Sequence, residues 1–267
     1  MHGARGATRG ICDDHDVPRL HYLLFGALSY GVALGSMIYL VPFLANRGVA
    51  KTIDSGVAGA TAAALAVDFA LLLAFAVTHS AMARRPAKAW LHRWLPACLE
   101  TSAFSLVAGV QMTCLLALWR PLPASVWRID ESAGRVLAWS LFALGWGIVV
   151  VGFTTLRNGR LFGLEQAWAG AFGREPEPPS IRRVGIYRHL RHPLYAGTLL
   201  SLWATPEMSA GHLLLAAVFS AYIFVGRRYE ERDLERLHGD AWRSYRAAVP
   251  AFLPRPRRPA PEPATRE

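Results

Sequence analysis

Charged residues are scarce in this sequence. Asp, Glu, Lys and Arg make up 18% of the 267 residues, whereas a typical soluble domain carries about 25%. Hydrophobic residues make up 53%, and the mean hydropathy is +0.23. They gather in blocks that match the roughly 20 residues with which a helix crosses the hydrocarbon core of a bilayer. The composition therefore excludes a soluble globular domain and predicts an integral membrane protein.

Cysteine is also rare. The three cysteines, Cys12, Cys98 and Cys114, are odd in number and far apart, and two of them lie in apolar stretches. Because no CxxC pair is present, we predict neither a disulfide framework nor a metal site. The net charge of +10 is not arranged as basic stripes interleaved with aromatic residues, so we predict no nucleic-acid partner.

The cofactor motifs of soluble enzymes are missing as well. There is no GxGxxG after a strand and no Walker loop, which excludes a soluble Rossmann-type methyltransferase or dehydrogenase. Gly145, Gly147 and Gly152 lie inside an apolar block instead. We predict that these three glycines serve helix packing.

Long apolar blocks dominate what is present. Four membrane-spanning helices are predicted from blocks at about 20–45, 57–80, 99–119 and 134–156. Basic residues test the orientation of these helices. With the N-terminus in the cytoplasm, the segments predicted to lie inside hold 24 of the 29 Lys and Arg residues, and those outside hold five. Because basic residues concentrate in cytoplasmic loops, this orientation is favoured.

A fifth apolar block, residues 194–226, has 33 residues, which is too many for one ordinary span. Its middle contains Pro206 and Gly211, which make a poor helix centre. We therefore predict a helical hairpin with arms at about 194–205 and 209–226. Both ends of the hairpin then reach the same membrane face, which keeps the basic C-terminal segment in the cytoplasm.

The remaining segments are polar. We predict a polar N-terminal segment (1–19), a single membrane domain (20–249) and a Pro-rich disordered tail (250–267). After the hairpin we expect a cytoplasmic helical cap, in which Gly239 ends one helix and Asp240 caps the next. The predicted fold class is thus an all-α polytopic membrane protein with four transmembrane helices, a C-terminal hairpin and a helical cap.

The densest group of polar residues flanks the hairpin. Arg191-His192-Pro193 precedes it and Glu230-Glu231 follows it, so the hairpin brings them together at the cytoplasmic face. One interpretation is a basic rim with ordinary ion pairs. The other is a functional site, because ionisable groups at the membrane boundary are candidates for function.

Other ionisable residues stand in or near the predicted spans. His79, Glu100 and Arg157 lie at the same cytoplasmic level, at the ends of neighbouring spans. Asp68 lies in the middle of the second span, where an unpaired charge is costly. We predict that Asp68 makes a hydrogen bond between helices.

The motif Arg191-His192-Pro193-x-Tyr195-x-Gly197, followed by a hairpin and Glu230-Glu231, resembles the isoprenylcysteine carboxyl methyltransferase and phospholipid methyltransferase superfamily. The chain is similar in particular to its branch of methanethiol S-methyltransferases and NnrU-like proteins. Segments that carry this second resemblance are His79-Ser80-x-Met82-Ala83-Arg84, Leu161-Phe162-Gly163-Leu164 and Trp203-Ala204-Thr205-Pro206. Residues 157–160 read Arg-Asn-Gly-Arg, where that branch carries Asn-His-Phe-Asp.

The resemblance implies a membrane enzyme that uses S-adenosylmethionine. Arg191 can hold the carboxylate of this cofactor in a bidentate pair, and Glu230 or Glu231 can accept from its ammonium or ribose. Tyr187 and Tyr195 can pack against adenine or face the sulfonium. The cofactor-binding residues implied are Tyr187, His189, Arg191, His192, Pro193, Tyr195, Gly197, Glu230 and Glu231.

The resemblance further implies a small thiol as methyl acceptor, with methanethiol converted to dimethyl sulfide. A thiol must become a thiolate, so a nearby base or cation helps. His79 and Arg157 are the candidates for this role, and Glu100 is the third predicted catalytic residue. A small apolar thiol would be able to enter from the bilayer.

Three alternatives remain at this stage. The first is a methyltransferase whose acceptor is an isoprenylcysteine or a phospholipid headgroup. The second is an NADPH-dependent reductase, since Gly239-x-x-Trp242-x-x-Tyr245 is similar to membrane sterol reductases. The third is a non-catalytic NnrU-like membrane protein. The Glu230-Glu231 pair and the short hairpin favour the methyltransferase.

Overall fold

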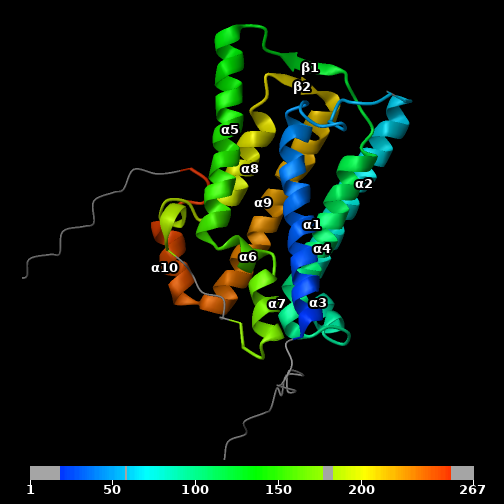
Figure 1. Ribbon diagram of the computed structural model, residues 1–267. Helices are drawn as coiled ribbons and strands as arrows, with labels where there is room; N and C mark the ends of the chain where they lie inside the picture. The colour runs from blue at the N-terminus through cyan, green and yellow to red at the C-terminus, as the bar shows by residue number, and fades with distance from the viewer. Residues whose placement is uncertain (1–18, 58, 177–182, 254–267) are drawn as a thin grey trace, which may run out of the picture.

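The computed structural model describes residues 19–57, 59–176 and 183–253. In this part of the chain, five helices are long and apolar enough to cross a membrane. They are α1 (Leu20–Leu44), α2 (Thr61–Met82), α4 (Glu100–Leu118, preceded by the 3-10 turn η1, Ala97–Leu99), α5 (Ser132–Thr155) and α9 (Ala210–His238). They run as one bundle (Figure 1). The predicted all-α polytopic membrane fold is confirmed.

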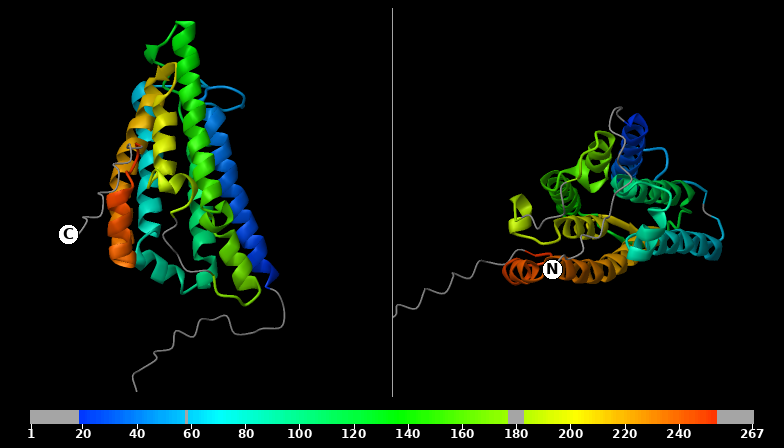
Figure 2. Two further views of the ribbon diagram at one scale, coloured as in Figure 1. Left: turned by 90° about the vertical axis from the view of Figure 1, so that its left-hand side faces the viewer. Right: turned by 90° about the horizontal axis from the view of Figure 1, so that it is seen from below.

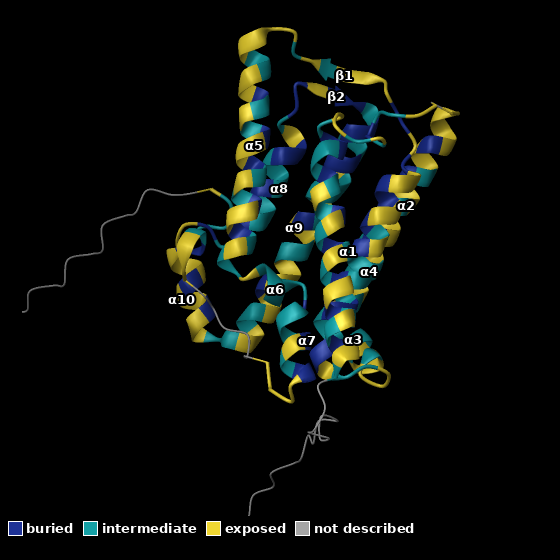
Figure 3. Cartoon of the chain, in the orientation of Figure 1, coloured by how far each residue is buried: buried dark blue, intermediate teal, exposed yellow. Residues whose placement is uncertain are grey.

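The outer faces of the bundle are apolar. Large hydrophobic side chains such as Leu28, Ile38, Phe69 and Val150 are exposed, and exposed positions run along the outside of the helices (Figure 3). In the most apolar part of each spanning helix, between 22% and 39% of the residues are buried. An apolar surface of this extent is the one that lipid covers, which makes the chain an integral membrane protein.

The C-terminal hairpin consists of α8 (Pro193–Trp203) and α9. Helix α8 has 11 residues, or about 17 Å, and it begins part-way along the bundle (Figure 1). The chain leaves the helical conformation around Pro206 and re-enters it after Ser209, whose hydroxyl accepts the backbone N–H of His212 at 3.1 Å. The Pro-containing turn therefore separates the two arms, as predicted.

A two-stranded sheet lies at the turn of the hairpin and was not predicted. Strand β1 (Ser125–Arg128) pairs antiparallel with β2 (Glu207–Ser209), so that Arg128 lies opposite Glu207. The two strands cross the end of the bundle (Figure 1). Strands of four and three residues are too short to show an alternating pattern in sequence, which is why the all-α prediction missed them.

Helix α9 is longer than the predicted second arm, which ended at residue 226. It continues as one helix to His238 because residues 227–238 contain neither Pro nor Gly. Gly239 ends it with a positive φ of 52°, and α10 (Asp240–Ala248) follows. Asp240 does not cap α10, contrary to our expectation. It is the first helical residue, and its carboxylate accepts from the guanidinium of Arg243.

Short helices gather at the end of the bundle opposite the sheet. They are α3 (Arg85–Leu91), α6 (Asn158–Leu161), α7 (Leu164–Ala171) and the 3-10 turn η2 (Gly185–Arg188). Figure 2 shows this end from the side and from below. It carries the basic loops, whereas the opposite end carries the sheet. The charge asymmetry of the sequence is therefore an asymmetry between the two ends of the bundle.

Glycine lets α5 and α8 approach closely. A Cβ on Gly145 would collide with Ser201, one on Gly197 with the Gly145 carbonyl, and one on Gly152 with Leu194. Packing therefore explains Gly145 and Gly152, as predicted. The same prediction is wrong for Gly147, because nothing lies within 4 Å of a Cβ placed there.

Buried polar residues tie helices together near the sheet. Asp68 is fully buried, and its Oδ1 accepts the backbone N–H of Arg120 at 2.8 Å. This hydrogen bond joins α2 to the segment after α4, so the predicted hydrogen-bonding role of Asp68 is confirmed. The buried His212 likewise places Nε2 2.9 Å from the carbonyl oxygen of Leu202, which joins the two arms of the hairpin.

Candidate active site

The two ends of the hairpin meet in a buried ion cluster. Arg191 donates to Glu231 at 3.0 Å, and Nε2 of His192 lies 2.9 Å from the same carboxylate oxygen. All three side chains are at least 90% buried. Pro193 begins α8 directly after this pair, since proline is favoured in the first turn of a helix. The predicted juxtaposition of the RHP segment with the Glu pair is therefore present in the structure.

Arg191 also holds the chain that follows α10. Its Nη1 donates to the carbonyls of Arg246 at 2.7 Å and Val249 at 2.6 Å. The backbone N–H groups of Arg191 and His192 donate to the carbonyls of Pro250 and Ala251. The guanidinium thus fastens the C-terminal segment onto α8. Residues 250–253 are therefore ordered, contrary to the prediction of a disordered tail from residue 250; the rest of that predicted tail, 254–267, lies outside the described residues. A direct bond from Arg191 to a cofactor stays a prediction.

Glu230 differs from its neighbour Glu231 in where it points. Successive residues of a helix lie about 100° apart, so Glu231 faces the ion cluster while Glu230 faces the space between α9 and α2. The Glu230 side chain is 45% exposed, and its Oε2 accepts the hydroxyl of Tyr195 at 2.7 Å. This carboxylate is therefore positioned by α8 but open to a ligand.

A cavity of about 680 Å³ lies between α2 and α9. Its walls combine apolar side chains with His79, Ser80, Tyr222, Tyr229 and Glu230. The structure therefore brings together His79 and Glu230, which were predicted for two different roles. We call this space the α2/α9 cleft.

His79 stands in a ring of aromatic side chains at the wall of the cleft. Its ring centroid lies 5.3 Å from that of Phe75, 4.6 Å from Phe104 and 6.1 Å from Tyr222. Its Nδ1 is buried and has no hydrogen-bond partner among the described residues. The imidazole is thus fixed in orientation while one ring nitrogen is available.

Tyr222 is a site residue that the sequence analysis missed. Its hydroxyl lies 3.4 Å from Oγ of Ser80, which donates to it across 142 positions of sequence. Tyr222 carries one polar side-chain atom and stands within the apolar run of α9, so the hydropathy of the sequence did not mark it as a site residue. A signal was available in the position itself, since Tyr222 stands seven residues, about two helical turns, before Tyr229 and so on the same face of α9.

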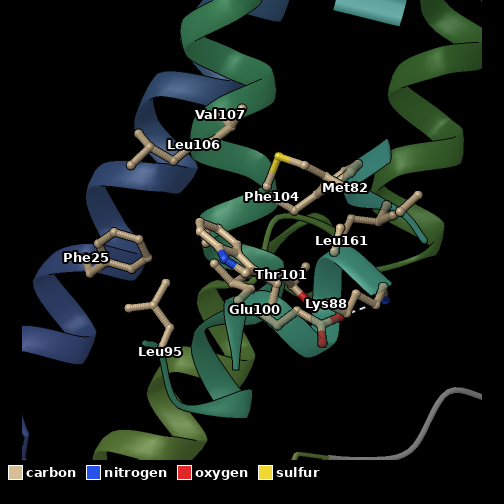
Figure 4. A pocket seen from close by; sticks show the side chains of 15 residues that line it. Phe25, Met82, Lys88, Leu95, Glu100, Thr101, Phe104, Leu106, Val107 and Leu161 are labelled. Carbon is tan, nitrogen blue, oxygen red and sulfur yellow. Dashed lines mark ion pairs between the residues drawn. The ribbon is translucent and has the colours of Figure 1, made fainter. Parts of the chain in front are cut away.

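Glu100 opens α4 and lines a second cavity. Its carboxylate lies 2.7 Å from Nζ of Lys88 and 2.7 Å from Nε2 of His92. The cavity measures about 550 Å³, and most of its wall is apolar, including Phe25, Met82 and Phe104. Figure 4 shows these side chains together with the ion pair of Lys88 and Glu100 at the edge. We call it the α1/α4 cavity.

Arg157 lies elsewhere. It has a positive φ of 62°, directly before α6, and its Nε lies 3.1 Å from Glu165. With Gln166 and Trp168, it lines a third cavity. The structure does not bring Arg157 into either of the cavities that His79 and Glu100 line, so its predicted role in forming a thiolate gains no geometric support.

The other predicted cofactor residues occupy varied positions. Tyr187 is buried and its carbonyl accepts the hydroxyl of Tyr245 at 2.7 Å. Burial raises the pKa of both tyrosines, that of Tyr245 to about 12, so both phenols stay protonated at neutral pH. His189 is exposed. Gly197 contacts Gly145, so helix packing already accounts for it.

Comparisons with known proteins indicate the family of this chain. The family model described as phospholipid methyltransferase matches residues 134–241, which include α5, α8 and α9 with the ion cluster. A methanethiol S-methyltransferase of a Pseudomonas species is 38% identical over 237 residues, covering 89% of this chain and 91% of that protein. One from Mycobacterium tuberculosis is 39% identical, covering 88% and 97%.

The chain belongs to the methanethiol S-methyltransferase family. It is therefore a membrane methyltransferase that uses a methyl donor, and these matches do not favour the reductase alternative. Nurim of Rattus norvegicus is 30% identical over 190 residues, covering 68% of this chain and 72% of that protein. No solved structure matches the chain.

Proposed function

We propose that this methyltransferase transfers the methyl group of S-adenosylmethionine to methanethiol and releases dimethyl sulfide. The names of its relatives support this acceptor. The observation that carries the proposal is that His79 and Glu230 line the same α2/α9 cleft. One of these groups suits the acceptor and the other suits the donor.

The residues of the cleft fit the proposed donor. S-Adenosylmethionine carries an ammonium, ribose hydroxyls and an aromatic base, and when bound it supplies an electrophilic methyl group on a sulfonium. Glu230 offers a partly exposed carboxylate that would accept from the ammonium or the ribose. Tyr222 offers an aromatic wall for the base or the cation, whereas the Tyr229 ring already carries the guanidinium of Arg84, 4.2 Å from its centroid. A volume of about 680 Å³ is in the range of small-molecule sites.

His79 is the residue we assign to the acceptor. A thiolate is the nucleophilic form of a thiol, so transfer is helped when a base takes the thiol proton. The buried Nδ1 of His79 lacks a partner, and the aromatic ring around it excludes water. The chain's main contributions are then orientation of the acceptor, removal of its proton and exclusion of water.

We further propose that the protein lies in a bacterial inner membrane with both termini in the cytoplasm. The basic loops support this orientation, because 24 of the 29 Lys and Arg residues fall in the segments on one side. That side is the end of the bundle with α3, α6 and α7 (Figure 1). The donor site at Glu230 then faces the cytoplasm.

The test uses the full-length protein in lipid with S-adenosylmethionine that carries a deuterated methyl group. Methanethiol, an isoprenylcysteine and phosphatidylethanolamine are offered separately. We expect the label in dimethyl sulfide, and no label in the other two acceptors. Transfer to the lipid or the isoprenylcysteine alone would contradict the proposed acceptor, and no transfer to any of the three would contradict the proposed function.

A further inference from the structure

Two cavities lie on either side of the contact between His79 and Phe104, His79 lining one and Phe104 the other. The α2/α9 cleft contains His79 and Glu230. The α1/α4 cavity lies on the other side of α2, and its wall includes Phe104, Leu106 and Val107 of α4. Ala83 lines both spaces. A short barrier of side chains therefore separates the polar cleft from an apolar cavity of similar size.

Phe104 forms this barrier next to His79. Its ring meets the imidazole edge to face, with centroids 4.6 Å apart, while the same ring lines the α1/α4 cavity (Figure 4). On its other sides His79 meets Phe75 and Tyr222. Tyr222 is held by its contact with Ser80, so the aromatic enclosure of His79 involves α2, α4 and α9.

We propose that Phe104 determines which thiols the enzyme accepts. This inference rests on the proposed function and adds to it a limit on the acceptor's size. With the Phe104 ring in place, the alkyl group of an acceptor whose sulfur lies near His79 is kept out of the α1/α4 cavity and must share the α2/α9 cleft with the donor. Without the ring, a longer alkyl chain extends from His79 into the α1/α4 cavity, whose apolar wall stabilises it.

The position of Phe104 beside His79 explains why it would decide between thiols of different length. Thiols that differ only in alkyl length present the same sulfur to His79, so discrimination must come from the space behind the sulfur. A single methylene changes specificity by roughly 10-fold to 200-fold in a well-shaped pocket. Among the described residues that line the α1/α4 cavity, Phe104 is the one whose ring contacts His79.

The experiment measures kcat/KM for straight-chain thiols from methanethiol to 1-hexanethiol with wild type, Phe104→Ala and Phe104→Leu. We expect wild type to lose activity steeply beyond ethanethiol. Both variants should raise the ratio of the 1-hexanethiol value to the methanethiol value by about tenfold or more, with the larger effect in Phe104→Ala. Residual methylation of methanethiol shows that each variant is folded.

Val107→Ala is the matched control. Val107 lines the same cavity from the same helix but is not part of the aromatic ring around His79. Its ratio should stay near that of wild type. An unchanged ratio in both Phe104 variants, or an equal rise in Val107→Ala, would overturn the inference while leaving the proposed function in place. Failure of wild type to methylate any thiol would overturn both.

Discussion

The hydroxyl of Tyr195 in α8 donates to the carboxylate of Glu230 in α9 at 2.7 Å. This hydrogen bond joins the two arms of the hairpin and fixes the position of one carboxylate oxygen. The Glu230 side chain is still 45% exposed, so the carboxylate remains open to the cleft. The neighbouring Glu231 is turned into the ion cluster instead. Glu230 lies at the edge of this cluster, 3.8 Å from Nδ1 of His192. We therefore expect different purposes of the two consecutive carboxylates: Glu230 to face a ligand and Glu231 to fasten the fold.

Tyr195→Phe tests the first of these purposes. The substitution keeps the ring and removes the donor to Glu230, so the carboxylate loses its fixed orientation. A hydrogen bond to a charged group contributes about 1.5–3 kcal/mol. We expect KM for S-adenosylmethionine to rise about tenfold, with kcat and the KM for the thiol little changed. A change confined to the thiol's KM would place Glu230 on the acceptor instead.

Arg191→Ala tests the second purpose. It removes the guanidinium that donates to the buried Glu231, so that His192 at 2.9 Å and the more distant Arg227 and Arg246 remain around this carboxylate, and it frees two backbone carbonyls. Breaking a buried ion pair by removing one partner costs about 3–5 kcal/mol, so we expect a marked fall in the thermal unfolding temperature in detergent. Arg188→Ala is the control, because Arg188 is exposed and should change stability by no more than about 0.5 kcal/mol. Equal stability of both variants would refute the fastening role.

Glycine positions on α5 give a prediction about helix packing. Gly145→Val places a side chain where Ser201 and the Gly197 backbone already lie, so α8 must move away from α5. We expect a large loss of folded protein, measured as the monodisperse fraction after extraction. Gly147→Val is two residues away in the same helix and meets nothing within 4 Å, so it should fold normally. Similar losses in both would contradict the packing argument, because position 147 has no neighbour for a side chain to collide with.

Asp68 yields a prediction that separates hydrogen bonding from charge. Its carboxylate oxygen accepts the N–H of Arg120 from a fully buried position. Asp68→Asn keeps an acceptor at this place, whereas Asp68→Ala removes the acceptor of the Arg120 N–H, and a hydrogen bond to a charged group contributes about 1.5–3 kcal/mol. We expect the Ala variant to unfold at a clearly lower temperature than the Asn variant. An equal loss of stability in both variants would mean that the negative charge, which both lack, is needed and the hydrogen bond is not.

The sequence was sufficient for the long helices and the hairpin, because both follow from contiguous apolar runs. Hydropathy reports the free energy of placing such a run in lipid, and Pro206 marks where the fifth run turns. The same runs contain no information about helix rotation. The contacts of Tyr222 with His79 and of Phe104 with His79 depend on how α2, α4 and α9 are rotated, so they became visible only in the structure.

The sequence predicted the part of the candidate site whose residues belong to a recognisable motif. Arg191, His192 and Glu231 lie together as expected. Arg157 was chosen only for its charge and its level in the membrane, and the structure places it beside Glu165 in another cavity. The depth of a residue in the membrane does not determine which side of the helix bundle its side chain faces.

The most direct test of the account is steady-state dimethyl sulfide formation by wild type, His79→Ala and Glu230→Gln, with Glu207→Gln as control. Glu207 is a carboxylate at the opposite end of the same hairpin, paired with Arg135. We predict that His79→Ala lowers kcat by about 100-fold or more, that Glu230→Gln mainly raises KM for S-adenosylmethionine, and that Glu207→Gln resembles wild type. Full kcat in His79→Ala, or an equal defect in Glu207→Gln and Glu230→Gln, would contradict the assignment of the α2/α9 cleft as the active site.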